Sequence, residues 1–96
     1  MITFEMFKQF VNTAILTGSF SYVKDGKELF YIGPLFENAG IELRTWDEQK
    51  EVLLGHCWSF FPQTMTIGEH CKMFWDNSAK SLIEKAFINN GDLGDF

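Results

Sequence analysis

The sequence predicts a single α+β domain in which an antiparallel four-stranded sheet has two helices packed on one face. Three observations favour this class. A segment with helical periodicity lies near each end of the chain, an Asp-Gly turn joins two β-rich segments, and two more strand-like segments precede the second helix. The predicted order is α-β-β-β-β-α. Residues 1–91 form the predicted domain, and residues 92–96 form a short acidic C-terminal tail.

Residues 3–17 have the periodicity of an amphipathic helix. Thr3 is a favoured N-cap residue, and Gly18 is of the type that commonly follows the last turn. Apolar residues recur at helical spacing along this segment: Phe4, Phe7, Val11, Ala14 and Ile15. We therefore predict a helix whose apolar side packs against the sheet.

Residues 19–33 predict a β-hairpin. Asp25-Gly26 lies between two β-rich segments and is typical of a type I′ turn, in which both central residues have positive φ. A regular two-residue loop pairs Phe20 with Tyr31 and Tyr22 with Leu29. These four residues are then predicted to share one face of the hairpin.

Two further strands are predicted after the hairpin. Residues 41–46 alternate between apolar and polar types, which is typical of a half-exposed strand. Residues 51–60 are ambiguous, because Thr45 and Glu48 have the spacing of a helix capping box. The Val, Cys, Trp and Phe content of this segment favours a strand, which is our prediction.

The second helix is predicted to begin near residue 67. Thr66 and Glu69 have the spacing of a capping box, and apolar residues continue at helical spacing to Phe87. Residues 76–78, with the sequence Asp-Asn-Ser, indicate a kink or a second start. Residues 89–91, with the sequence Asn-Asn-Gly, indicate the end of the helix.

The charge and hydropathy of the chain restrict its partners and its location. A net charge of −5 and a pI of about 4.8 disfavour direct nucleic-acid binding and favour a protein partner with a basic surface. The N-terminus has no signal-peptide pattern, and no apolar run approaches the length of a membrane span. We expect a cytoplasmic protein that does not enter a membrane.

Both histidines and both cysteines occur in two dipeptides, His56-Cys57 and His70-Cys71. Two of each is the ligand count of a zinc site, but adjacent residues point in different directions and the usual pair spacings are missing. A Cys–His nucleophile and a Cys57–Cys71 disulfide are further alternatives. We predict packed free cysteines, with no metal ion, no cofactor and no enzymatic activity.

The aromatic content predicts a surface for a partner. Phe, Trp and Tyr make up 17% of the residues, which is more apolar area than the core of one small domain requires. We predict acidic residues that steer a basic partner and aromatic residues that anchor it. The steering residues are Glu42, Asp47, Glu48 and Glu51, and the anchors are Trp46, Tyr22, Tyr31 and Phe36.

These features predict a small acidic protein-binding module that inhibits or occludes its partner. In general class, although in no residue motif, such a protein resembles the inhibitors that phages and plasmids deploy against their hosts, anti-CRISPR proteins among them. That resemblance implies a host nucleic-acid-binding defence protein as the target. Two alternatives are a homo-oligomeric structural or adaptor domain, such as a homodimer, and a Cys/His enzyme or zinc-binding domain.

Overall fold

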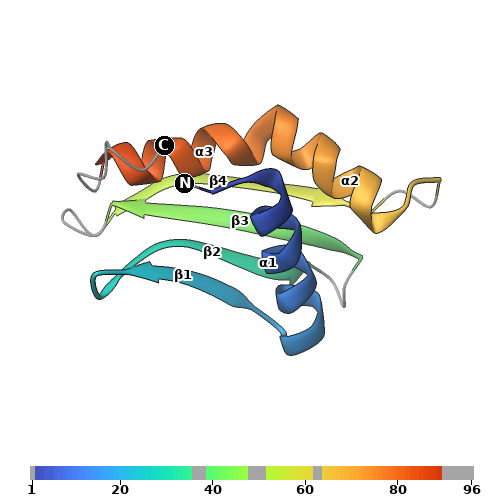
Figure 1. Ribbon diagram of the computed structural model, residues 1–96, viewed down its shortest axis with the longest axis horizontal. Helices are drawn as coiled ribbons and strands as arrows, with labels where there is room; N and C mark the ends of the chain where they lie inside the picture. Colours follow the sequence, from blue (N-terminus) through green and yellow to red (C-terminus); the bar gives the residue numbers. More distant parts are fainter. Residues whose placement is uncertain (1, 36–38, 48–51, 62–63, 90–96) are drawn as a thin grey trace.

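The computed structural model describes residues 2–35, 39–47, 52–61 and 64–89, with the side chains of residues 47, 52 and 89 left out of the description. Figure 1 shows one sheet with helical segments packed against it. The elements are α1 (Phe4–Thr17), β1 (Phe20–Lys24), β2 (Lys27–Leu35), β3 (Gly40–Asp47), β4 (Val52–Phe60), α2 (Ile67–Phe74), η1 (Trp75–Ala79) and α3 (Lys80–Asn89).

The four strands pair in sequence order, β1-β2-β3-β4, and every pair is antiparallel. The predicted α+β class and the element order are therefore confirmed. The ambiguous segment at 51–60 contains strand β4, as predicted. The tail predicted at residues 92–96 lies outside the described residues.

Helix α1 begins and ends as its sequence predicts. The Thr3 hydroxyl accepts a hydrogen bond from the Met6 backbone N–H at 3.2 Å, which satisfies one free donor of the first turn. Gly18 adopts a φ of 98°, and its N–H donates to the carbonyl oxygen of Ala14 at 2.9 Å. Phe7, Val11 and Ala14 are the buried residues of the helix.

The β1–β2 hairpin has the predicted turn but not the predicted register. Asp25 and Gly26 both have positive φ, 54° and 78°, as a type I′ turn requires. Phe20 pairs with Ile32 and Tyr22 with Phe30, so the predicted pairs with Tyr31 and Leu29 are wrong. The reason is a β-bulge in which Leu29 is the extra residue, because Val23 pairs with Glu28 and Tyr22 with Phe30.

The core lies between the sheet and the helical segments. Phe7 of α1 and Phe87 of α3 belong to the same buried cluster as the strand residues Phe30, Ile32 and Leu43. Figure 1 shows α1 crossing the strands while α3 runs along β4. This arrangement is compatible with the predicted packing of both helices on one face.

Strand β3 is more deeply buried than its alternation predicts. Ile41, Glu42 and Leu43 are consecutive residues and all three are buried. The prediction of a half-exposed strand is therefore wrong for this part of β3. The reason is that Glu42, which points away from the core, is covered by neighbouring side chains, because Arg44 and His56 contact its carboxylate.

The C-terminal helical segment is continuous but irregular. Thr66 caps α2, since its hydroxyl accepts from the Glu69 N–H at 3.1 Å and donates to the Glu69 carboxylate at 3.0 Å. The predicted kink coincides with η1, a π-helical segment in which the Lys80 N–H donates to the Trp75 carbonyl oxygen. Trp75 and Ala79 are buried here.

Two Gly→Ala substitutions should change the stability in opposite directions. Gly26→Ala places a Cβ at positive φ and should lower the free energy of unfolding by about 1 kcal/mol. Gly68→Ala lies in the first turn of α2, where the new methyl group would be 4.0 Å from the Thr66 hydroxyl oxygen, and should raise it by about 0.5–1 kcal/mol. Urea unfolding of wild type and both variants measures these changes in the free energy of unfolding. Equal changes for the two variants would contradict the turn geometry at Gly26.

Candidate functional site

Strand β4 presents small side chains to the helices and large ones to the opposite side. Residues alternate across a strand, and β4 pairs with β3 so that Cys57 lies beside the buried Leu43. Its inward residues are therefore Gly55, Cys57 and Ser59. Its outward residues are His56, Trp58 and Phe60, and all three are exposed.

The small inward residues allow the C-terminal helical segment to lie close to β4. A Cβ added at Gly55 would collide with the side chain of Leu82 on α3. The Ser59 hydroxyl lies 2.7 Å from Nε2 of the buried His70 on α2. Close contact at these points leaves no space for the large β4 residues on this side, so they point outward.

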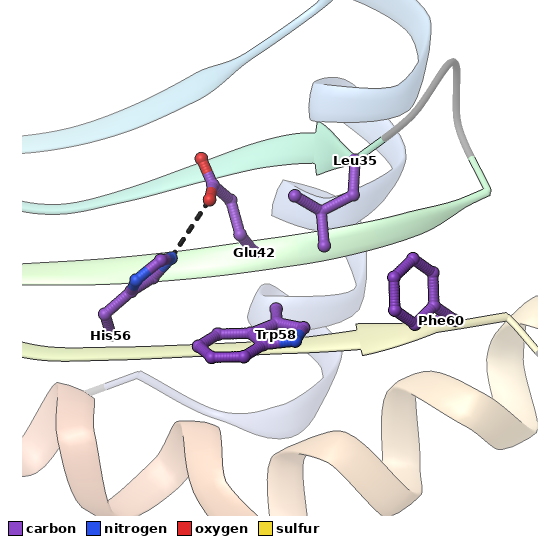
Figure 2. Close-up of a pocket in the computed structure, with 5 residues that line it drawn as sticks. All are labelled: Leu35, Glu42, His56, Trp58 and Phe60. Atoms are coloured by element: carbon purple, nitrogen blue, oxygen red, sulfur yellow. Dashed lines mark hydrogen bonds and ion pairs between the residues drawn. The ribbon is translucent and has the colours of Figure 1, made fainter.

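The outward residues join those of β2 and β3 in rows across the sheet. One row contains Tyr31, Arg44 and His56, the next Gly33, Glu42 and Trp58, and the third Leu35, Gly40 and Phe60. We call this surface the outer face; its side chains are Tyr31, Leu35, Glu42, Arg44, His56, Trp58 and Phe60. Figure 2 shows five of them in front of the strands, with α1 behind.

A shallow hollow of about 250 Å³ opens on the outer face. It is lined by Leu35, Glu42, His56, Trp58 and Phe60 (Figure 2). The surface that the lining presents is almost entirely apolar. The hollow is therefore suited to an apolar group and offers few polar atoms to a ligand.

Glu42 is the buried charge of the outer face, and it is already compensated. Only 9% of the residue is exposed. Its carboxylate lies 3.0 Å from His56 Nε2 and 3.2 Å from an Arg44 guanidinium nitrogen. Arg44 also lies over the Tyr31 ring, 5.9 Å from its centroid. These contacts offset the desolvation of the carboxylate, so the centre of the face is close to neutral.

Large apolar side chains remain exposed around the hollow. Trp58 is 58% exposed and Phe60 is 52% exposed. Leu53, which pairs with Trp46 near the start of β4, is 47% exposed. The described Phe, Tyr and Trp residues other than Trp58 and Phe60 are buried or half-buried. Among the described residues, the exposed aromatic side chains are thus confined to β4, whereas exposed aliphatic and Met side chains also lie elsewhere, at Leu16, Val23, Met65, Ile67 and Ile88.

The predicted anchors occupy different places. Tyr22 is half-buried on the core side, stacked on Phe30 with ring centroids 5.0 Å apart. Tyr31 belongs to the outer face, and half-buried Trp46 pairs with Leu53. Phe36 lies outside the described residues. Tyr31 is therefore the predicted anchor that the structure brings into the outer face.

The predicted steering residues are divided between the described and undescribed parts of the chain. Glu42 is held by Arg44 and His56, as shown above. Asp47 is the last residue of β3, but its side chain is not among those described. Glu48 and Glu51 lie outside the described residues, in the segment between β3 and β4.

The acidic excess of the chain does not come from the described side chains. These include seven acidic residues, Glu5, Asp25, Glu28, Glu42, Glu69, Asp76 and Glu84, and seven basic ones, Lys8, Lys24, Lys27, Arg44, Lys72, Lys80 and Lys85. Of the 13 acids and 8 bases of the whole chain, six acids and Lys50 remain. The net charge of −5 therefore comes from Glu37, Asp47, Glu48, Glu51, Asp92 and Asp95 together with Lys50.

The two His-Cys dipeptides do not converge on one site. His56 points to the outer face and bonds Glu42, whereas His70 lies in the core beside Ser59. Among the described residues there is no group of three or more His, Cys, Asp or Glu side chains arranged to hold a metal ion. Both cysteines are free thiols. Burial raises the pKa of Cys57 to about 11 and also raises the pKa of Cys71.

Ser59 and His70 are within hydrogen-bond distance, as a nucleophile and its base would be. His70 Nδ1 is buried and has no hydrogen-bond partner among the described residues, so the acceptor that orients a catalytic histidine is missing there. The Phe61 ring packs edge-on against the imidazole at 5.0 Å. The Ser59–His70 contact ties β4 to α2.

His56, Trp58 and Phe60 are the site residues that sequence reasoning missed. Their spacing of two was visible in the sequence, as was the small size of the residues between them. That pattern indicates a strand with one large and one small side. Its orientation follows from the contacts of Gly55 and Ser59 with distant helices, which the sequence does not show.

Comparison with protein-family models, with curated proteins and with solved structures finds no match for this chain. In the part of the chain that the structure describes, no helix has the length and apolar character needed to cross a bilayer. The outer face and the charge distribution are therefore the features of the molecule that bear on its function.

Alkylation should be slow at both cysteines in the folded protein. With the pKa of Cys57 raised from 9.0 to about 11, its thiolate fraction near pH 7.5 should be roughly 100-fold below that of an unperturbed thiol. Iodoacetamide labelling followed by peptide mass spectrometry, with and without 8 M urea, measures this at each cysteine. Rapid native labelling at pH 7 or below would instead support the Cys–His nucleophile.

His70 should make stability depend on pH. Burial lowers the pKa of His70 in the folded protein, so the unfolded chain binds a proton at higher pH. The stability that the neutral imidazole contributes is fully present above about pH 6.5 and is lost as the pH falls below that value. Urea unfolding between pH 7.5 and 5.0 should show a smaller decrease for His70→Gln than for His56→Gln, the matched control. Equal decreases would show that His70 is not the titrating group.

Proposed function

We propose that this chain is a small protein-binding module whose outer face docks on a partner protein and occludes a basic surface of that partner. The observation that carries the proposal is the exposed pair Trp58 and Phe60 beside an apolar hollow. Large exposed apolar groups on one face are typical of interaction sites, and Trp is enriched among the residues that dominate binding energy.

The shape of the hollow favours a protein over a small molecule. Pockets for drug-sized ligands are usually about 300–1,000 Å³ and enclose most of the ligand. The hollow is smaller, at about 250 Å³, and open to solvent. It has the size for a side chain of a partner whose remaining surface covers the rows around it.

The charge distribution supports a basic partner. Four of the six remaining acids lie at or beside strand ends in the sequence: Glu37 follows β2, Asp47 ends β3, and Glu48 and Glu51 lie between β3 and β4. Such charges attract a basic protein over distances near the Debye length, about 8 Å at physiological salt. The apolar contact supplies affinity, and the acids increase the association rate. A nucleic-acid-binding protein is the class of partner with the required basic surface, and covering that surface would inhibit it.

Retention of a partner should depend on the outer face. Wild-type protein, Trp58→Lys and Leu16→Lys are each immobilised and incubated with an extract of the native host, and the proteins that each retains are compared. Leu16 is a matched apolar control because it is 84% exposed and belongs to α1, which lies behind the strands that carry the outer face in Figure 2. A specific partner should be retained by wild type and Leu16→Lys, and at least tenfold more weakly by Trp58→Lys, which is about 1.4 kcal/mol.

The purified partner then tests occlusion and steering. Fluorescence anisotropy should show that wild type prevents the partner from binding nucleic acid and that Trp58→Lys does not. Changing Asp47, Glu48 and Glu51 to Lys should lower the association rate constant and its dependence on salt. A retained partner that still binds nucleic acid, or that binds Trp58→Lys equally well, would contradict the proposal.

A further inference from the structure

The outer face has the dimensions of a weak dimer interface. Its three strands, about 4.8 Å apart and eight or nine residues long with a rise of about 3.3 Å, cover roughly 400 Å². Two such faces packed together would bury on the order of 1,000 Å² once the relief of the side chains is included, which is the size of weak, transient interfaces. Sheets commonly pack face to face about 10 Å apart, with side chains from both sheets interdigitating.

The charges of the described side chains do not oppose a contact between two outer faces. Glu42 is paired with Arg44 and lies within hydrogen-bond distance of His56, and the described side chains contain equal numbers of Asp and Glu and of Lys and Arg residues. The contact of two outer faces therefore places no uncompensated charge from these side chains in the interface. The remaining repulsion comes from the acids outside the described side chains, and salt screens it.

The arrangement of Trp58 and the hollow is self-complementary. Trp58 lines the hollow and is itself more than half exposed (Figure 2). In a two-fold dimer one patch meets its own copy, so a protruding group needs a recess on the same patch. The hollow has a nearly apolar lining that includes Leu35 and Phe60. An indole ring suits it because the ring is large, flat and mostly apolar.

We propose that in the free protein a second copy of this chain covers the outer face, with Trp58 of each copy in the hollow of the other. Interfaces of this size are typical of weak, transient contacts, so we expect a reversible dimer with a dissociation constant on the order of 1–100 µM. The same face then serves either a second copy or a partner, and the dimer must dissociate before a partner docks. This inference concerns the free protein and does not depend on the identity or the existence of the partner.

Sedimentation equilibrium of the full chain between 1 and 300 µM tests the dimer. Wild type should pass from monomer to dimer over this range. Trp58→Lys should raise the dissociation constant at least tenfold, because a charged group would enter an apolar recess. Leu16→Lys should leave it unchanged, since it introduces the same charge at an exposed leucine of α1. Phe60→Lys repeats the test on the opposite side of the hollow, and circular dichroism melting shows whether each variant is folded.

Salt distinguishes the dimer from docking on a basic partner. Raising NaCl from 0.05 to 0.5 M should strengthen the dimer or leave it unchanged, because it screens repulsion between two chains of charge −5. The same change should weaken binding to a basic partner.

Three results would overturn the dimer proposal. These are a monomer at 300 µM, a dimer unaffected by Trp58→Lys and Phe60→Lys, and a dimer abolished instead by Val23→Pro on β1, which would indicate pairing through the sheet edge. None of them contradicts the proposed function.

Discussion

The alternation of small and large side chains along β4 determines which residues the sheet presents on its outer face. The inward positions hold Gly55, Cys57 and Ser59, and the helical segments contact the strand where those residues are small. A register shift by one residue would bring His56, Trp58 and Phe60 into the core, where Leu82 and His70 already lie. The packing of the C-terminal helical segment against β4 therefore keeps the aromatic residues on the outer face.

The apolar contact surface and the excess negative charge of the protein lie in different parts of the chain. The hollow on the face is almost entirely apolar, and the Glu42 carboxylate is paired with Arg44 and hydrogen-bonded to His56 within the molecule. The acidic excess belongs to other segments of the chain. Because the charges and the apolar surface are separate, salt or substitution of the acids can change the association rate without altering the apolar contact.

Local signals explain what the sequence predicts correctly. Caps at Thr3 and Thr66 and the turn at Asp25-Gly26 depend on a few neighbouring residues, so their chemistry can be recognised directly. The class and order of elements follow from such signals together with periodicity. The hairpin register does not, because the bulge at Leu29 allows both Leu29 and Phe30 to be buried, a result of packing against helices far along the chain.

The candidate site was predicted only in part, for similar reasons. Composition indicated an apolar excess, but it did not indicate which strand holds it. Glu42 was predicted to be a steering charge because it belongs to a cluster of five acids between residues 37 and 51. In the fold, pairing of β3 with β4 brings His56 beside it, Arg44 lies two residues away on the same strand, and the carboxylate becomes a buried structural group. Long-range pairing of this type has no signature in a single sequence.

The π-helical segment at Trp75–Ala79 sets the rotational relation between α2 and α3. One residue of an α-helix corresponds to a rotation of about 100°. Loss of one residue within this segment would leave α2 in place and turn Ile83 and Phe87 away from the sheet. The number of residues in this turn is therefore as strongly constrained as their identity, and insertions or deletions here should be tolerated less well than substitutions at exposed Asp76 or Asn77.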